Sequence, residues 1–141
     1  MRRLSQLSTA ITSSMPWQDH CHAPAFGTAL CCLEAVPDGG CKELRYGSGD
    51  ASFRLLLYRR GKEVRAYINS CPHFALPLNA NSATFFLLDD ARIMCAWHCA
   101  VFRLEDGYCE EGPAKGLTLD RVPVSLVENR VMLVEGSTRG T

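Results

Sequence analysis

Two short stretches decide how this sequence is interpreted: Cys71-Pro72-His73 and Cys95-Ala96-Trp97-His98. In each stretch a histidine follows a cysteine after one or two residues, so both carry the same pair of side chains in the same order. Thiolate sulfur and neutral imidazole nitrogen are both good ligands for borderline-soft metal ions. The four side chains are therefore suited to one zinc ion, or to a two-iron cluster with both cysteines on one iron and both histidines on the other.

The composition limits the chain to ordinary globular classes. It has 141 residues, 47% of them apolar, which suffices for one domain with an ordinary core. Its 15 basic and 15 acidic residues give no net charge, whereas nucleic-acid-binding domains carry a marked basic excess. No apolar run approaches the roughly 20 residues of a membrane-spanning helix. We therefore expect no nucleic-acid partner and no membrane partner.

The chain contains eight cysteines, two of which belong to the ligand stretches. Arg2 and Arg3 are not followed by the apolar segment of a secretory signal peptide, so we expect a cytoplasmic protein with reduced thiols. Four other cysteines are interpreted as small buried or nearly buried side chains. These are Cys31, Cys32, Cys41 and Cys109.

The first residues lack hydrophobic periodicity and are expected to form a tail. Its His20-Cys21-His22 cluster is interpreted as an exposed, disordered segment, and Met15 is an alternative start of translation, so the status of residues 1–14 stays open. The rest of the chain is assigned to one domain. The expected boundaries are 1–27 for the N-terminal tail, 28–136 for the domain and 137–141 for the C-terminal tail.

From Ala29 onward, short apolar runs alternate with turn signals. Arg60-Gly61-Lys62, Glu105-Asp106-Gly107 and Glu128-Asn129-Arg130 each separate two apolar runs and predict β-hairpins. Helical spacing is nowhere sustained, so no helix is predicted. Many short strands at close spacing indicate an all-β sandwich or barrel. The expected strands are Leu30–Leu33, Cys41–Tyr46, Phe53–Tyr58, Val64–Ile68, Ala91–Met94, Val101–Leu104, Tyr108–Cys109, Val122–Val127 and Val131–Val134.

The residues around the ligand stretches resemble the Rieske [2Fe-2S] proteins, and within them the soluble, low-potential ferredoxins that serve oxygenases. The likeness covers roughly residues 28 to 136, with the loops 71–78 and 95–102 and the downstream Gly112-Pro113 as its most specific parts. It implies a β-sandwich or partly open barrel of short antiparallel strands. Two loops, between about residues 70 and 113, form its cluster-binding part.

The resemblance also assigns the ligands. Cys71 and Cys95 bind one iron of a [2Fe-2S] cluster, and His73 and His98 bind the other, at the tips of two β-hairpins. Gly112-Pro113 then forms the loop on the third side of the cluster. A structural zinc site is the alternative, although zinc modules normally group their cysteines in one pair and their histidines in another.

Two features depart from the family pattern. The spacer between the two ligand pairs, residues 74–94, is longer than usual, and we place the extra length in a surface loop near Asn79–Asp90. Cys99 stands where the family usually has glycine. If this position needs a positive φ, cysteine is strained there. We interpret Cys99 as a neutral replacement and do not count it as a ligand.

The second loop predicts a low reduction potential. High-potential members of the family carry a serine and a tyrosine after the second histidine, where this chain has Ala100 and Phe102. They also join the two loops by a disulfide, at positions that are Leu76 and Trp97 here. Hydrogen bonds to the sulfurs raise the potential of such centres, so we expect a midpoint on the order of −150 mV.

These expectations describe a monomeric one-electron carrier that passes electrons from an NAD(P)H-dependent flavoprotein reductase to an oxygenase. It is not a complete oxygenase, because only His20 and His22 remain for a second iron site. The alternatives are a small electron-transfer subunit of a larger oxidoreductase, similar to nitrite reductase, and a zinc-stabilised interaction module.

Partner docking is expected to use the surface around the two ligand histidines. Phe74, Leu76 and Pro113 are predicted to give this surface an apolar patch. The acidic side chains between Glu105 and Glu111 are a weaker candidate for electrostatic steering, since such a run is usually only a solvated hairpin.

Overall fold

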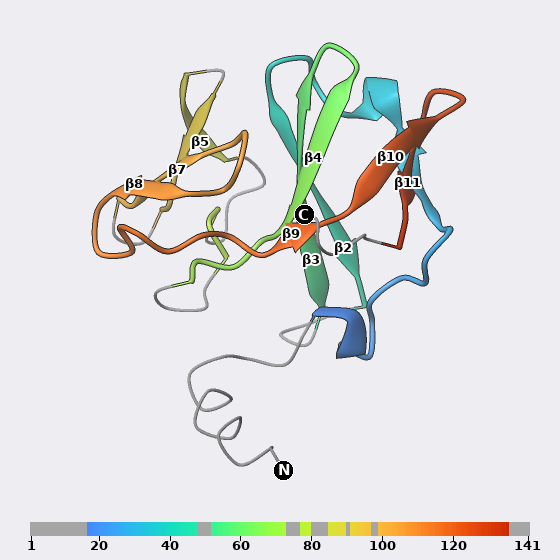
Figure 1. Cartoon of the computed structure of the whole chain (residues 1–141), viewed down its shortest axis with the longest axis horizontal. Coiled ribbons are helices and arrows are strands. Elements are labelled where there is room, and N and C mark those ends of the chain that lie inside the picture. The colour runs from blue at the N-terminus through green and yellow to red at the C-terminus, as the bar shows by residue number, and fades with distance from the viewer. Residues whose placement is uncertain are drawn as a thin grey trace.

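The computed structural model describes residues 17–47, 52–72, 77–79, 85–89, 91–96 and 99–135. Within these ranges the chain forms three antiparallel β-sheets and two 3-10 helices, η1 (Trp17–Asp19) and η2 (Leu33–Ala35). In this part of the chain no helix is long and apolar enough to cross a membrane. The predicted all-β class is confirmed, as an open arrangement of sheets and not a closed barrel (Figure 1).

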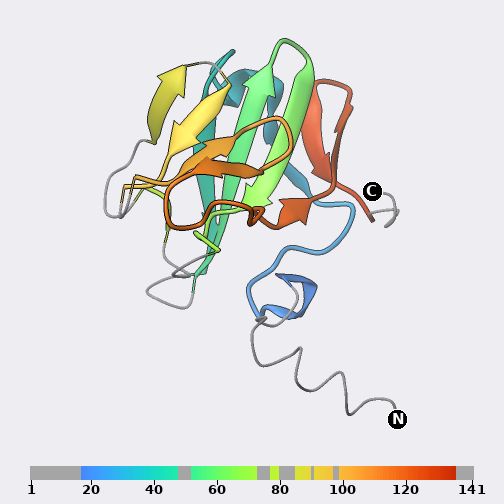
Figure 2. The ribbon, with the colours of Figure 1, turned by 60° about the vertical axis from the view of Figure 1, so that its left-hand side comes forward.

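A four-stranded sheet in the order β2-β3-β4-β9 lies in the middle of the fold. The sheet β5-β6-β7-β8 lies on one side of it and the sheet β1-β11-β10 on the other (Figures 1 and 2). The strands are β1 (Ala29–Cys32), β2 (Cys41–Tyr46), β3 (Phe53–Arg60), β4 (Glu63–Ile68), β5 (Phe86–Asp89), β6 (Arg92–Met94), β7 (Val101–Arg103), β8 (Cys109–Glu111), β9 (Arg121–Val122), β10 (Val124–Val127) and β11 (Arg130–Leu133).

Strand β3 joins the two cores of the molecule. Leu56 and Tyr58 pack into a core shared with β6, β7 and β8, while Leu55 and Leu57 pack into a second core shared with β9 and β11. Successive side chains of a strand point to opposite faces, so a continuous apolar run is what a strand covered on both faces requires. Each such buried side chain contributes about 1.5–3 kcal/mol to the free energy of unfolding.

The three predicted hairpins are present, with one correction. Arg60 pairs with Glu63 across the first turn, and Val127 pairs with Arg130 across the third. The predicted strand Val122–Val127 is in fact two strands, because β9 pairs with β4 while β10 pairs with β11. Pro123 separates them, since proline has no N–H group to donate to a sheet ladder.

The long spacer contains a strand where a surface loop was expected. Strand β5 forms one edge of the sheet β5-β6-β7-β8 and pairs with β6. Phe86, Leu87 and Leu88 on this strand are all exposed, whereas Phe85 just before it packs against the core. The register of β5 is interrupted between Leu87 and Asp89, and such irregularities protect an edge from pairing with another chain.

The expected N-terminal tail is described from Trp17 onward, and this part packs against the middle sheet. The Trp17 ring lies 6.1 Å from the ring of Phe53 and 6.1 Å from that of Phe26. His20, expected in an exposed segment, is half-buried, with its ring 5.2 Å from the same phenylalanine. Contacts between aromatic rings therefore hold the segment around Trp17 and His20 against the middle sheet, although its sequence shows no hydrophobic periodicity.

All eight cysteines lie within the described residues, and none of them forms a disulfide bond. Cys109 is buried and Cys41 packs against the same core, as predicted. Burial raises the pKa of the Cys41 thiol to about 12. Cys31 is half-buried because it packs against the second core, whereas the next side chain, Cys32, points to the opposite face of β1 and is exposed.

Candidate metal centre

The two predicted cysteine ligands, Cys71 and Cys95, are buried in one core. Cys71 follows β4 after two residues and is 3% exposed, and Cys95 directly follows β6 and is 1% exposed. Both belong to the buried cluster that lies between the middle sheet and the sheet β5-β6-β7-β8. A strand end thus positions each thiol, which is a rigid support for a ligand.

The second ligand loop is the tip of a hairpin. Met94 on β6 pairs with Val101 on β7, and the residues between them form the loop. The N–H of Cys95 donates to the carbonyl of Ala100 at 2.7 Å, and the N–H of Cys99 donates back to the carbonyl of Cys95 at 3.1 Å. Two backbone hydrogen bonds therefore close the base of this loop.

The first ligand loop is not a hairpin tip, which corrects the expectation of two hairpins. Strand β4 before it belongs to the middle sheet, while β5 after it belongs to the neighbouring sheet, so the segment crosses between sheets. Its later part is nonetheless fixed to the second loop, because the N–H of Ala96 donates to the carbonyl of Leu78 at 2.8 Å. The two loops are thus joined by a main-chain hydrogen bond beside Cys95.

A third loop, which contains Gly112 and Pro113, packs against the second one. Gly112 has φ = +96°, and a Cβ atom added to it would lie 2.7 Å from the Cα of Ala100. Only glycine permits both this backbone conformation and this close approach. Pro113 is exposed, as expected for a surface around the site.

Cys109 is a third buried thiol in the core that holds the two predicted cysteine ligands. Its Sγ donates to the carbonyl of Glu111 at 3.1 Å. Burial, together with the nearby Cys71, raises the pKa of the Cys109 thiol. The interpretation of Cys109 as a buried core side chain is confirmed.

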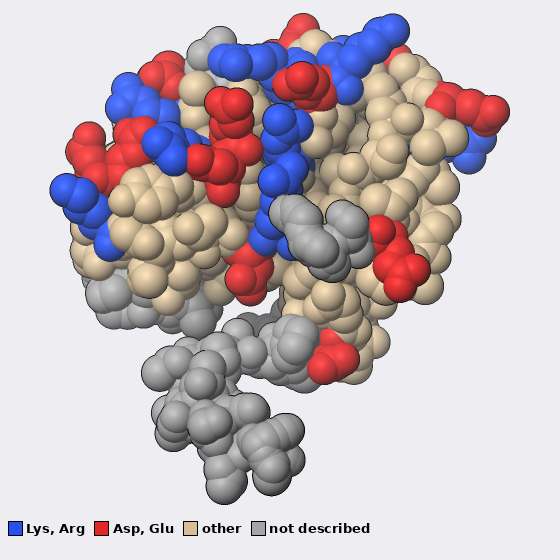
Figure 3. Space-filling view, in the orientation of Figure 1, with Lys and Arg blue, Asp and Glu red and all other residues tan. Residues whose placement is uncertain are grey.

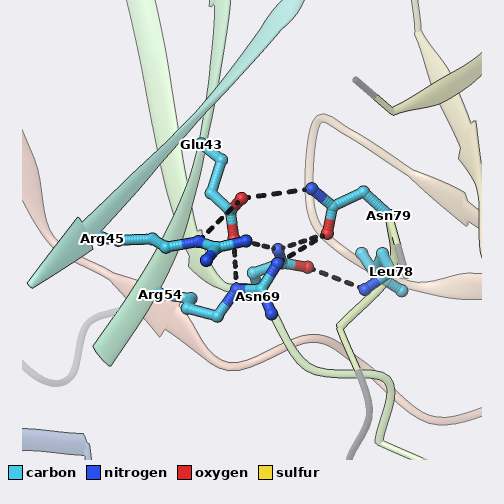
Figure 4. Close-up of polar contacts among 6 residues, drawn as sticks. All are labelled: Glu43, Arg45, Arg54, Asn69, Leu78 and Asn79. Atoms are coloured by element: carbon cyan, nitrogen blue, oxygen red, sulfur yellow. Dashed lines mark hydrogen bonds and ion pairs between the residues drawn. The ribbon is translucent and has the colours of Figure 1, made fainter. Parts of the chain in front are cut away.

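Behind the first ligand loop lies a buried polar network that the sequence did not predict (Figure 4). Its centre is Glu43 on β2, which accepts hydrogen bonds from Arg54, Asn69 and Asn79. Burial opposes ionisation of Glu43, but these hydrogen bonds outweigh it and lower the pKa of the carboxyl group. The only sequence signal for the network is a set of polar residues within otherwise apolar segments.

The two predicted histidine ligands, His73 and His98, lie outside the described residues, as do Phe74, Leu76 and Trp97. Elsewhere in the described chain, no three His, Cys, Asp or Glu side chains are arranged to hold a metal ion. This holds in particular for the His20-Cys21-His22 segment.

Cys99 has φ = +59°, so this position does need the left-handed conformation that favours glycine. Its side chain is exposed, and removing the thiol costs no packing. We expect Cys99→Gly to raise the free energy of unfolding by about 0.5–1 kcal/mol, since relief of the left-handed strain exceeds the entropic cost of glycine. Urea unfolding measures this free energy. Cys99→Ala keeps the Cβ atom and should not become more stable. An equal gain in stability in both variants would show that the left-handed conformation is not strained.

The acidic stretch near the second loop is partly neutralised by its neighbours. Arg103 donates to Asp106 at 2.5 and 3.1 Å and lowers the pKa of that carboxyl group. Arg92 lies 3.9 Å from Glu110. Basic and acidic side chains alternate over this side of the molecule (Figure 3). A partner thus meets alternating charges here and no continuous acidic patch.

A model of the Rieske [2Fe-2S] domain matches residues 21–130 of this chain. This region contains both ligand loops and every strand of the three sheets except β11, of which only Arg130 lies within the match. The chain belongs to the Rieske [2Fe-2S] domain family.

Three known proteins illustrate the range of similar chains. Human apoptosis-inducing factor 3 is 29% identical over 85 residues, which are 60% of this chain and 13% of that protein. The ferredoxin of carbazole 1,9a-dioxygenase from Nocardioides aromaticivorans IC177 is 16% identical with a TM-score of 0.60, covering 79% of this chain and 100% of that one. A chain from a complex of reduced oxygenase and oxidized ferredoxin in carbazole 1,9a-dioxygenase is 21% identical with a TM-score of 0.59. The match covers 79% of the present chain and 94% of the chain from that complex.

Family membership implies a [2Fe-2S] cluster, which sets the zinc alternative aside. The described residues fit such a group. Two buried cysteines that form no disulfide bond, Cys71 and Cys95, lie in one core, and Gly112 allows a third loop to approach the second one closely. Buried, reduced cysteines are the donors that iron–sulfur clusters require. The chain spans only 13% of the length of its human relative, so the activity of that whole protein is not transferred to it.

Proposed function

We propose that this chain is a one-electron carrier whose [2Fe-2S] cluster is bound by Cys71 and Cys95 on one iron and by His73 and His98 on the other. The observation that carries the proposal is the burial of both cysteines in one core, each at the end of a strand, within the region that matches the family. A bound cluster of this kind supplies reversible one-electron chemistry.

The protein's own contribution is to set the potential at which the electron enters. Histidine ligands leave the oxidised centre neutral, which raises its potential relative to an all-cysteine centre. Donors to the sulfurs raise it further. At the positions where high-potential members have hydroxyl groups, this chain has the apolar, buried Ala100 and Phe102. The hydroxyl contribution from these two positions is therefore missing here.

We expect a midpoint potential on the order of −150 mV, at the low end of the range for Rieske centres. A redox titration of the purified holoprotein, followed by visible absorption, measures it. A midpoint above zero would contradict the absence of hydroxyl donors around the cluster. The matched variant is Ala100→Ser, which introduces one hydroxyl in the second loop and should raise the midpoint.

An oxygenase is the electron acceptor that we favour, with a flavoprotein reductase as the donor. The support is the likeness in fold to a complete ferredoxin chain of a dioxygenase system, and to a chain from a complex of oxygenase and ferredoxin. We place docking around the two histidines and Pro113. The partly neutralised acidic stretch is the weaker candidate for steering, because exposed ion pairs are screened by salt. We also propose a monomer in the reducing cytoplasm, with which eight cysteines that form no disulfide bond agree.

The second candidate is an electron-transfer module of a larger oxidoreductase. It is favoured by the match to a short part of human apoptosis-inducing factor 3. The two candidates differ in how the protein purifies from its native source. A diffusible carrier elutes alone at the size of a 15.6 kDa monomer with two irons, whereas a module elutes with a large redox partner.

A further inference from the structure

Glu43 is a carboxylate held away from water by a complete set of donors. Its side chain is 9% exposed, and Arg54 donates to it together with the amides of Asn69 (2.9 Å) and Asn79 (3.2 Å) (Figure 4). A buried charge is costly unless it is fully paired, so such a network constrains the positions of all its members. The members come from β2, from β3 and from the two residues that flank the first ligand loop, Asn69 and Asn79.

Asn69 connects this network to the first loop. Its Nδ2 donates to Glu43 and also to Oδ1 of Asn79 at 2.9 Å, while its Oδ1 accepts the N–H of Leu78 at 2.8 Å. A backbone N–H can only donate and a carboxylate can only accept, so the amide has one possible orientation. Asn69 therefore supplies a donor and an acceptor that an isosteric aspartate cannot both supply.

Leu78 continues the connection to the second loop. Its N–H is held by Asn69, and its carbonyl accepts the N–H of Ala96 at 2.8 Å. Asn69 lies two residues before Cys71, and Ala96 directly follows Cys95. One chain of hydrogen bonds therefore runs from Glu43 through the first loop to the residue beside the second cysteine.

We propose that Glu43 and Asn69 are positioning residues for the cluster, which fix the two cysteine-bearing loops relative to each other. This inference rests on the ligand assignment proposed above. Neither side chain is a ligand. They act through Leu78 and Ala96, so that the loops are held in place by the middle sheet and not by the bound metal alone.

The test uses an exchange of donor and acceptor in the purified holoprotein. Asn69→Asp keeps the shape of the side chain but places an oxygen against the Glu43 carboxylate. We expect iron release to a chelator to become about tenfold faster, with an altered visible circular dichroism spectrum of the cluster. Adding Glu43→Gln to this variant places an amide opposite the introduced carboxylate. The double variant should therefore release iron at close to the wild-type rate.

A matched control exists on the far side of the molecule. Asn129 donates to Glu34 at 2.5 Å on the exposed surface, so Asn129→Asp makes the same chemical change away from the loops. Iron release is compared at temperatures equally far below the Tm of each variant, which removes the effect of global stability. If Asn69→Asp does not fold, Glu43→Gln alone takes its place, with faster release again expected.

The possible outcomes bear separately on the positioning role and on the proposed function. Faster release for Asn69→Asp than for Asn129→Asp, with recovery in the double variant, supports the positioning role. Equal release from the two aspartate variants, or a double variant no better than the single one, overturns it. The proposed function is contradicted if a variant that lacks Cys71 still binds two irons. If the Cys71 variant loses its iron but Asn69→Asp releases iron at the wild-type rate, only the positioning role is contradicted.

Discussion

Replacing Cys71 or Cys95 with alanine is expected to reduce the iron content from about two atoms per chain to near zero. Each thiol is a proposed ligand to the same iron, and an iron atom that loses one of two thiolates is not retained in a buried site. The Tm should fall as well, because cluster binding stabilises the folded chain. Iron and acid-labile sulfide are measured per chain after purification under anaerobic conditions.

Cys109→Ala is the matched control for these two variants. Cys109 is buried in the same core and is replaced by the same smaller side chain, so the loss of packing is comparable. We expect this variant to keep about two irons and the wild-type spectrum. Full iron content in either ligand variant would contradict the assignment, and so would the loss of iron from the Cys109 variant alone.

The second large effect is expected for Gly112→Ala. The added Cβ would lie 2.7 Å from the backbone of Ala100, and a residue with a side chain is disfavoured at φ = +96°. Backbone atoms cannot yield as a flexible side chain does, so the third loop must move away from the second. We expect a loss of about 3 kcal/mol in the free energy of unfolding, from overpacking and backbone strain together. Urea unfolding of the holoprotein measures this loss.

Gly116→Ala separates the two contributions. Gly116 has a similar φ of +92°, but a Cβ there would meet no atom within 4 Å. This control is expected to lose about 1–2 kcal/mol, from backbone strain alone. The difference between the two variants reports the contact of the third loop with Ala100. Equal losses would mean that the two loops do not touch in solution.

The features that could be predicted from the sequence are those that depend on local chemistry. A cysteine followed closely by a histidine, twice in the same order, is a pattern that ligand chemistry imposes. Gly61 marks the β3–β4 turn because that position has φ = +62°. Cys99 was recognised as out of place because the family has glycine there, and its positive φ gives the physical reason.

The features that could not be predicted depend on contacts between distant segments. The hydrogen bond between Asn69 and Glu43 joins residues 26 positions apart, and it forms only in the register that pairs β2 with β3. Strand β5 was missed because its apolar residues are exposed, so burial does not impose an alternating pattern. The close approach of Gly112 to Ala100 likewise requires the packed loops.

In the proposed centre, two imidazoles bind one iron of the cluster and two thiolates bind the other. Pulsed electron paramagnetic resonance of the reduced holoprotein is the sharpest test of this arrangement, because a nitrogen bound to iron couples strongly to the unpaired electron. We predict two distinct nitrogen couplings that change when histidine is labelled with ¹⁵N, and the loss of one in His73→Cys and of the other in His98→Cys. A reduced cluster without nitrogen couplings, or a chain that binds a single metal ion and gives no signal on reduction, would contradict the account.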